Sequence, residues 1–383
     1  MFGRRLVAFA CLVAMVMMAA IACEDDDGSG DGTPSVVADA SQETSASPEA
    51  ASPTAETVTY APDGPVTFSV LAGSTEGNRD VEAFMPADIK IRAGDSIEWT
   101  SHGFEGHTIT FGANPDNILF EIGDYLVPDP ANPSQVIFNP KLALASERQG
   151  TVDGDGAYIN SGFFGVPAAA TYKLTFTKEG LYQYLCLVHP FTMTGTVTVE
   201  PESAQVVSPE TVTSRAEAER DRHLEELQQE ARRVDAASRS APGPGDSTIH
   251  YVQVGAITDH GQVAVYLPGA LDIKAGDTVI FQNDDRNFHN VIFKGDREEL
   301  PAGIGIVPDP DGRGLNFSLD PASAVAVDPP VEGFDETTFL SSGSMGVLQP
   351  RLNWTLKFDT PGTYVYACTI HVLAGMTGVI NVQ

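Results

Sequence analysis

The chain has 383 residues, which is enough for two or three domains that each bury a core. Its 52 acidic and 22 basic residues give a formal net charge of −30. This excludes a nucleic-acid partner, since phosphate binding needs a basic face. The same acidity would attract a partner protein with a basic docking surface, or would simply keep the protein soluble.

The first predicted element is a signal peptide over residues 1–23. Arg4 and Arg5 precede an apolar run over residues 6–22, and small residues lead up to Cys23. The stretch "AIAC" resembles a bacterial lipobox, although Ala replaces the usual Leu at its start. We therefore expect Cys23 to be lipidated, which would anchor an exported protein to the cell membrane, facing the periplasm or the cell exterior. A plain cleaved signal and an uncleaved anchor are the alternatives.

Residues 24–56 follow as a predicted flexible tether. Almost no bulky apolar side chain occurs in this segment, so burial cannot offset the entropy of ordering it. A tether of this length would hold the folded part away from the membrane surface.

The cysteines do not suggest a disulfide framework, although exported proteins commonly contain one. Cys11 belongs to the signal peptide and Cys23 is the expected lipid site, so Cys186 and Cys368 remain. These two occupy the same place in an internal repeat. We therefore expect them to act separately.

The repeat has an offset of 182 residues, seen first where "FMPADIKIRAGDSIEW" matches "YLPGALDIKAGDTVIF". The same offset relates His107 to His289 and Cys186 to Cys368. We therefore expect two similar domains, over residues 57–200 and 248–383.

Each half contains short segments of alternating apolar and polar residues, such as "VTFSV", "HTITF" and "GTVTV", separated by turn residues. A period of two with frequent turns indicates a β-sandwich. The predicted fold class is therefore all-β, with two tandem sandwiches. Residues 145–165 and 331–350 are predicted to form long loops or a small extra hairpin, and no chemistry is assigned to them.

Residues 201–247 form a charged linker with a predicted helix. Ser208 suits the N-cap, Pro209 the first helical position and Glu210 the N-terminal end of the dipole, so a helix should run to about Ala237. At 1.5 Å per residue its length is roughly 40 Å.

This helix carries a narrow apolar stripe, formed by Leu224, Leu227, Ala231 and Val234. The stripe could lie on a domain or pair with another chain. The alternative is a mostly solvated spacer held by charge pairs along the helix.

A Cys, a His and a Met lie close together after one strand in each half. Alternation in "LYQYLC" places Cys186 on the same face as Tyr182 and Tyr184, which we expect to be core residues. The thiol therefore points inward, and His189 and Met193 follow in the loop. The corresponding residues of the second half are Cys368, His371 and Met376.

A second imidazole is available in each half, because His107 and His289 each begin a predicted strand 79 residues before the Cys. Two His and one Cys with a weak axial Met is the ligand set of copper electron carriers. A zinc site would usually have more His or Cys, or an open position for water. We therefore predict two copper ions, with the ligands His107, Cys186, His189, Met193, His289, Cys368, His371 and Met376.

The segments "YLCLVHPFTM" and "YACTIHVLAGM", each preceded by an "AGD" strand and by "HTI" or "HNV", resemble the cupredoxin family of blue copper proteins. The resemblance covers both predicted domains. It implies a Greek-key β-sandwich with a type 1 copper site and electron transfer to redox partner proteins through the exposed edge of the loop histidine. It also implies that Asn290 braces the Cys loop, where the first half has Thr108 instead.

Three functions remain open from the sequence. We favour a membrane-tethered, extracytoplasmic electron-transfer protein, and copper storage or delivery is the alternative. A two-domain multicopper oxidase or nitrite reductase needs further histidines, commonly beside the Cys ligand, and the sequence contains no His-x-His pair. We therefore expect no enzymatic activity. The other histidines, His102, His223, His250 and His260, are interpreted as loop, surface or linker residues.

Overall fold

The computed structural model describes residues 59–60, 63–103, 105–113, 124–133, 135–165, 171–237, 239–284, 286, 288–330, 333–346 and 352–383. These residues belong to one compact unit, Glu56–Gln383. The predicted signal peptide, with Cys23, and the predicted tether over residues 24–56 lie outside the described residues.

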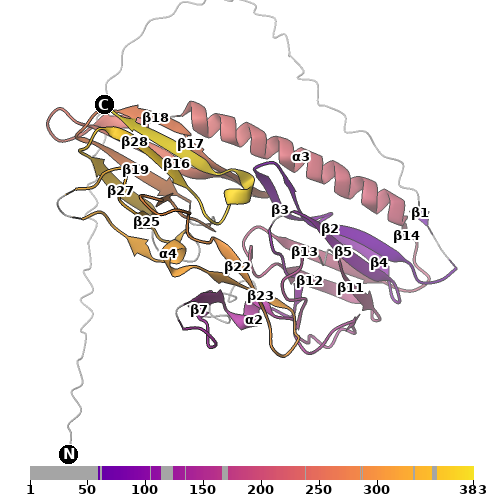
Figure 1. Ribbon diagram of the computed structural model, residues 1–383. Coiled ribbons are helices and arrows are strands. Elements are labelled where there is room, and N and C mark those ends of the chain that lie inside the picture. Colours follow the sequence, from indigo (N-terminus) through magenta and orange to yellow (C-terminus); the bar gives the residue numbers. More distant parts are fainter. Residues whose placement is uncertain are drawn as a thin grey trace, which may run out of the picture. The chain divides into compact units, whose positions relative to one another are not determined.

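The first half is built mostly from strands (Figure 1). Its elements are β1 Thr59–Tyr60, β2 Thr67–Glu76, β3 Arg79–Met85, β4 Asp88–Arg92, β5 Ser96–His102, β6 Thr110–Phe111, β7 Leu126–Pro128, β8 Val136–Phe138, α2 Pro140–Ala143, β9 Thr151–Val152, β10 Ile159–Asn160, β11 Thr171–Phe176, β12 Gly180–Leu185 and β13 Thr194–Glu200.

The linker contains β14 Val206–Val207, α3 Pro209–Ala236 and β15 Arg239–Pro242. The second half contains β16 Thr248–Thr258, β17 Gly261–Leu267, β18 Ala270–Ile273, β19 Asp277–Asn283, β20 Phe288–His289, β21 Ile292–Phe293, β22 Ile304–Pro308, β23 Leu315–Leu319, α4 Pro321–Ala324, β24 Ala326–Val327, β25 Leu340–Ser342, β26 Met345–Gly346, β27 Asn353–Phe358, β28 Gly362–Ala367, the 3₁₀ turn η1 Val372–Ala374 and β29 Thr377–Val382.

The two halves repeat one sandwich topology. In the first half β3-β2-β5-β11-β9 faces β10-β6-β12-β13-β4, and in the second β27-β19-β16-β17 faces β18-β29-β28-β21-β25-β24. The parallel pairs β2 with β5 and β13 with β4 recur as β16 with β19 and β18 with β29. The predicted fold class, two tandem Greek-key sandwiches joined by a charged helix, is confirmed.

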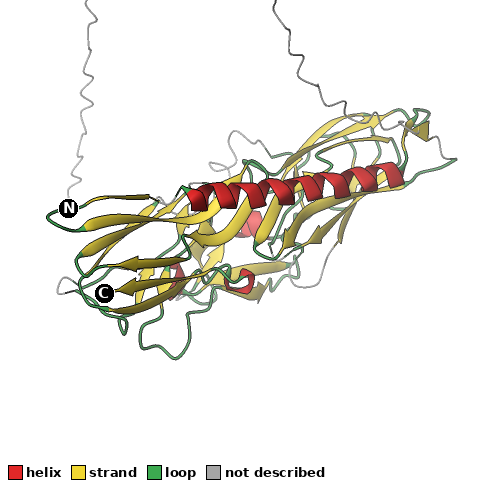
Figure 2. Cartoon of the chain, turned by 90° about the horizontal axis from the view of Figure 1, so that it is seen from above, coloured by secondary structure: helices red, strands yellow, loops and turns green. Residues whose placement is uncertain are grey.

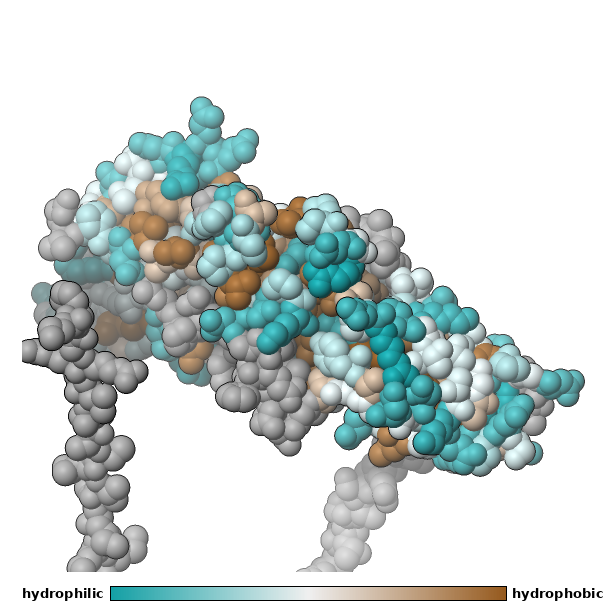
Figure 3. Space-filling view, turned by 90° about the horizontal axis from the view of Figure 1, so that it is seen from below, coloured by the Kyte–Doolittle hydropathy of each residue, from teal (hydrophilic) through white to brown (hydrophobic). Residues whose placement is uncertain are grey.

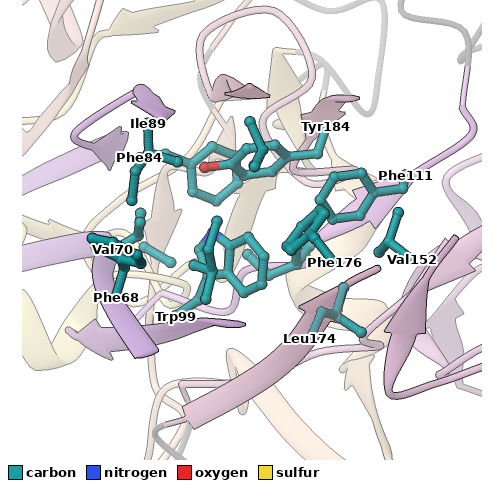
Figure 4. Packing of buried hydrophobic residues seen from close by; sticks show 14 of the residues in the cluster. Phe68, Val70, Phe84, Ile89, Trp99, Phe111, Val152, Leu174, Phe176 and Tyr184 are labelled. Atoms are coloured by element: carbon teal, nitrogen blue, oxygen red, sulfur yellow. The ribbon is translucent and has the colours of Figure 1, made fainter. Parts of the chain in front are cut away.

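Aromatic side chains fill the core of the first sandwich (Figure 4). The ring of Tyr184 lies 4.5 Å from that of Phe84, 5.5 Å from that of Trp99 and 5.1 Å from that of Phe111, between centroids. Tyr184 is thus a core residue, as the alternation predicted. On the face drawn in Figure 3, apolar residues appear in small groups separated by polar ones.

Pairing between strands of different halves joins the two sandwiches. The antiparallel pair β3 and β17, with Val81 opposite Gly261 and Arg79 opposite Val263, makes one sheet continuous across both halves. The strands β8 and β23 pair in the same way within a separate sheet, β22-β23-β8-β7. Backbone hydrogen bonds between these strands therefore fix how the two sandwiches sit against each other. The sequence alone did not indicate this pairing.

The linker helix α3 begins as the sequence predicted, because Ser208 accepts a hydrogen bond from the backbone N–H of Thr211 at 3.3 Å and Pro209 is the first residue of the helix. The helix lies along strands of both halves (Figures 1 and 2). Within the described residues, no helix is long and apolar enough to cross a membrane.

The apolar stripe of α3 is buried on the protein itself. Leu224 and Leu227 pack with Val81 of β3 and with Ala256 and Val263 of the second half. The interpretation of this helix as a mostly solvated spacer is therefore wrong. Burial of these side chains holds the linker against the junction of the two halves.

Candidate metal centres

The second half brings His289, Cys368 and His371 together in a buried group. The Sγ atom of Cys368 lies 3.5 Å from Nδ1 of His371 and 3.9 Å from Nδ1 of His289, and the two Nδ1 atoms are 3.0 Å apart. His289 ends β20, Cys368 follows β28, and His371 precedes η1. One donor atom of each side chain therefore points to a common centre.

The first half brings His107, Cys186 and His189 together in the same way. The Sγ atom of Cys186 lies 3.8 Å from Nδ1 of His189, and the rings of His107 and His189 lie 5.3 Å apart between centroids. In each group the three donor atoms all lie within 4.8 Å of one another.

The two methionines are attached to these groups through the backbone. The N–H of Cys186 donates to the carbonyl of Met193 at 2.9 Å, and the N–H of Cys368 donates to that of Met376 at 3.0 Å. Both Met side chains are buried in the same core cluster as the Cys of their own half. Each thioether is therefore placed in the apolar surroundings of its thiol.

The residues fit copper. Both nitrogens of His107 are buried without a hydrogen-bond partner, which is costly unless another group binds them. Nε2 lies where a Cβ atom on Gly73 would approach to 2.1 Å, and one donor atom of His107 lies within 4.8 Å of those of Cys186 and His189. A thiol, two imidazoles and a buried thioether form a soft donor set that suits copper better than zinc.

The charges around the first site favour the thiolate form of Cys186, which is the form that binds a metal. Burial alone would raise the pKa of Cys186, but the imidazoles of His107 and His189 hold it well below the ordinary value. Burial lowers the pKa of His189, but Glu82 and Cys186 raise it to about 10. In the metal-free protein the proton therefore sits on the imidazole beside a thiolate, and metal binding must displace it.

Each half braces the residue that follows its Cys. The Oδ1 atom of Asn290 accepts from the N–H of Thr369 at 2.9 Å, and the Oγ1 atom of Thr108 accepts from the N–H of Leu187 at 2.8 Å. Thr108 thus makes the contact that the resemblance implied for Asn290 alone. In the first half the N–H of Thr108 also donates to Sγ of Cys186 at 3.3 Å, and this stabilises a thiolate.

The segments 145–165 and 331–350, for which no chemistry was predicted, pair with the backbone of His107 and His289. Phe164 exchanges backbone hydrogen bonds with His107, and β26, which contains Met345, pairs with β20 at His289. The sequence signal was limited to the repeated "SG" in both segments. Their role depends on pairing over long sequence distances, which local patterns do not specify.

The loop histidine of the second half is covered. The Nε2 atom of His371 lies 3.1 Å from Oε1 of Glu105, which belongs to the first half, and His371 is only 7% exposed. The expectation of an exposed histidine edge is therefore wrong for His371. With a metal on Nδ1, Nε2 would carry the proton and donate a hydrogen bond to this carboxylate.

The loop histidine of the first half faces a carboxylate as well. Its Nε2 atom lies 3.8 Å from Oε1 of Glu82, which also accepts from Gln262 of the second half at 2.7 Å.

We call Asp80, Glu82 and Glu105 the interface carboxylates. Burial and mutual repulsion raise the pKa of Asp80. Burial also raises that of Glu82. Burial would raise the pKa of Glu105 too, but the hydrogen bond and charge of His371 lower it to about 2.

Sequence reasoning missed the interface carboxylates. Asp80 and Glu82 sit in β3, where they look like outward-facing polar residues, and only the pairing of β3 with β17 buries them. Glu105 lies two residues before His107 in the sequence. Its role could not be predicted from this position, because it depends on the contact with His371 in the other half.

The remaining histidines differ from one another. His102 is exposed and His250 is half-buried beside Asp277, at 3.2 Å. His223, by contrast, is only 3% exposed and lies 3.0 Å from Glu226 and in ring contact with His260. His223 is thus a residue of the linker, as one of the expected alternatives had it, but the alternative of a surface position is wrong.

Both halves of the chain match a family of copper-binding proteins. Residues 71–200 and 252–383 match the model of the family described as copper binding proteins, plastocyanin/azurin family. Plastocyanin of Scenedesmus fuscus is 31% identical over 119 residues, which cover 31% of this chain and 87% of that protein. Chloroplastic plastocyanin of Pisum sativum is 28% identical over 118 residues, which cover 31% of this chain and 51% of that protein. Among solved structures, oxidised plastocyanin of Dryopteris crassirhizoma is similar, with 22% identity and a TM-score of 0.20 over 34% of this chain and 99% of that one.

Proposed function

This chain belongs to the plastocyanin/azurin family of copper-binding proteins, and from this premise we propose that it is a one-electron carrier with two type 1 copper sites. The observation that carries the proposal is the repeated group of two His and one Cys, with donor atoms within 4.8 Å of one another in both halves. Proteins named plastocyanin are its relatives over about a third of the chain.

Copper held by this donor set supplies a one-electron change between Cu(I) and Cu(II). The protein residues keep the ligands in place during that change. Thr108 and Asn290 fix the loops that follow the Cys residues, and backbone hydrogen bonds join each Cys to its Met. Because the ligands are buried and braced, little rearrangement accompanies the change in charge.

We further propose that the two sites work in series. The side chain of Glu105 is hydrogen-bonded to the proposed ligand His371, and Glu105 lies two residues before the proposed ligand His107 in the chain. This contact supplies a short path of covalent bonds and one hydrogen bond between the two ligand sets. A protein whose sites served two unrelated partners would have no need of this connection.

The proposed location is the outer face of the cell membrane, through a lipid on Cys23. The signal-like residues 1–23 support this proposal, and so does the net charge of −30, which suits redox partner proteins with a basic surface. Mass determination of the mature N-terminus tests it: an unmodified residue there, or retention of residues 1–22, would contradict the lipid anchor.

Copper reconstitution with visible spectroscopy and a redox titration tests the function. We expect thiolate-to-copper absorption from two sites and reversible one-electron waves. The variant Cys368→Ser should remove the second-site band and keep that of the first site, and Cys186→Ser should do the reverse. Copper binding without a reversible wave would instead favour storage or delivery.

A further inference from the structure

His223, Glu226 and His260 form a third group of metal-binding side chains, apart from the two copper sites. His223 and Glu226 lie one turn apart on α3, and His260 lies in the turn between β16 and β17. Nδ1 of His223 is 3.0 Å from Oε2 of Glu226, and Nδ1 of His260 is 3.9 Å from the same oxygen. Among the described residues, these three donor atoms lie within 4.8 Å of one another.

The spacing suits a small divalent ion. Zinc binds imidazole nitrogen at about 2.0–2.1 Å and carboxylate oxygen at about 2.0–2.2 Å, so tetrahedral ligand atoms lie roughly 3.4 Å apart. The observed separations of 3.0 and 3.9 Å fall on either side of this value. Small side-chain rotations would therefore close the group around an ion.

His223 presents its Nδ1 atom to the group. Nδ1 donates to Oε2 of Glu226 at 3.0 Å, and Nε2 accepts from the guanidinium of Arg222 at 3.5 Å, since an arginine only donates. A bound ion would therefore take the place of the Nδ1 proton, which would pass to Nε2 as the exposed Arg222 turns away.

A further carboxylate is close by. Glu219 lies one turn before His223 on the same face of α3, and burial raises its pKa while the charges of Arg215, Arg222 and His260 lower it. It also forms an ion pair with Arg215 at 3.6 Å, and it is not one of the three side chains whose donor atoms lie within 4.8 Å of one another. The fourth position around an ion would therefore be left to water.

We propose that His223, Glu226 and His260 bind a divalent transition-metal ion of the zinc type. Two imidazoles and one carboxylate are a donor set that zinc uses. In contrast to the copper sites this group contains no sulfur, so it has no preference for Cu(I).

The position of the group gives the ion a structural role. The backbone carbonyl of His260 accepts a hydrogen bond from the N–H of Glu82 in β3 at 2.8 Å, and His223 belongs to the linker helix. An ion bound here would fasten the linker to the second half at the point where that half touches the first. It would thus stabilise the arrangement that brings Glu82 and Glu105 to the copper ligands.

Zinc binding to the full-length, copper-loaded protein tests this proposal. We expect one equivalent of Zn²⁺ beyond the two coppers by calorimetry and metal analysis, with the copper absorption unchanged and the unfolding temperature raised. In His260→Ala, a change at a half-exposed side chain, the zinc affinity should fall by at least about tenfold, as it does when even the supporting partner of a ligand is removed.

The exposed His102 provides the matched control, since His102→Ala removes an imidazole outside the group and should leave zinc binding unchanged. Glu226→Gln removes the bridging charge while keeping the size of the side chain, and it should weaken binding as His260→Ala does. Retained copper absorption shows that each variant is folded. Equal zinc affinity in His260→Ala, Glu226→Gln and the parent protein, or no zinc uptake by the parent, would overturn the proposal.

Discussion

At the scale of single residues, each proposed copper site depends on neighbouring groups that set the position of an imidazole. Gly73 shows this most clearly, because its missing side chain makes room for His107. Its φ of +76° also lies in the left-handed region, where glycine carries no steric penalty. The site therefore depends on a residue that is not itself a ligand and that the sequence did not single out.

The substitution Gly73→Ala should disable the first site. Its Cβ atom would lie 2.1 Å from Nε2 of His107, so the imidazole must move away from Cys186. We expect the first-site absorption to be lost or strongly reduced after copper reconstitution, while that of the second site stays. Visible spectra of the variant in the Cys368→Ser background would show the first site alone.

Gly77 offers a control for the backbone conformation. It has a similar φ of +65°, and no atom lies within 4 Å of the position that a Cβ atom would take there. Gly77→Ala should therefore cost about 1–2 kcal/mol of stability through the left-handed backbone alone and leave both absorptions intact. If Gly73→Ala behaved like Gly77→Ala, the close approach to His107 would be refuted.

At the scale of elements, α3 stabilises the junction of the two halves. Its apolar stripe packs on β3 of the first half and on β16 and β17 of the second, and these strands are neighbours in the continuous sheet. The helix is otherwise highly charged, so its stability derives mainly from this packing.

The substitution Leu227→Ala should destabilise the junction. The side chain is fully buried. Its truncation leaves a cavity and should lower the free energy of unfolding by about 2–5 kcal/mol. Denaturant unfolding followed by fluorescence should show a lower midpoint. Glu225→Ala, at an exposed position of the same helix, should change the free energy of unfolding by less than about 0.5 kcal/mol. Equal effects of the two substitutions would mean that the helix does not pack on the sheet in solution.

At the scale of the whole folded unit, the loop histidines His189 and His371 both face the interface carboxylates. Asp80, Glu82 and Glu105 come from the first half, and Glu105 reaches the ligand His371 of the second. A negative carboxylate near a ligand histidine favours the more positive Cu(II) state. Burial would raise the pKa of Glu105, but His371 lowers it to about 2, so the charge of Glu105 should lower the potential of the second site.

The substitution Glu105→Gln should raise the reduction potential of the second site. The amide oxygen can still accept from Nε2 of His371, but the negative charge is gone. The rise should be on the order of tens of millivolts, since about 59 mV corresponds to a tenfold change in a one-electron equilibrium. A redox titration in the Cys186→Ser background would report the second site alone.

The exposed Glu179 is the control for loss of charge. Glu179→Gln should leave both potentials within a few millivolts of the parent, because solvent and salt screen a distant surface charge. An unchanged second-site potential in Glu105→Gln would show that the contact between the halves does not form in solution, and it would remove the basis for sites that work in series.

Much of the fold was predictable because its signals are local. Alternating residues indicate strands, Ser208 and Pro209 indicate the start of α3, and the repeat indicates two similar halves. The pairing of β3 with β17 carries no such local signal. Its consequences, buried Asp80 and Glu82 and a covered His371, could therefore not be predicted from the same patterns.

The two sandwiches and the residue types of each metal group could be derived from local patterns, because strand alternation and ligand spacing follow from chain geometry over a few residues. The contacts of the loop histidines with the interface carboxylates, and of His223 with Glu226 and His260, arise only in the folded chain. Those contacts join segments that are distant in the chain, and packing rather than local propensity selects which distant segments meet.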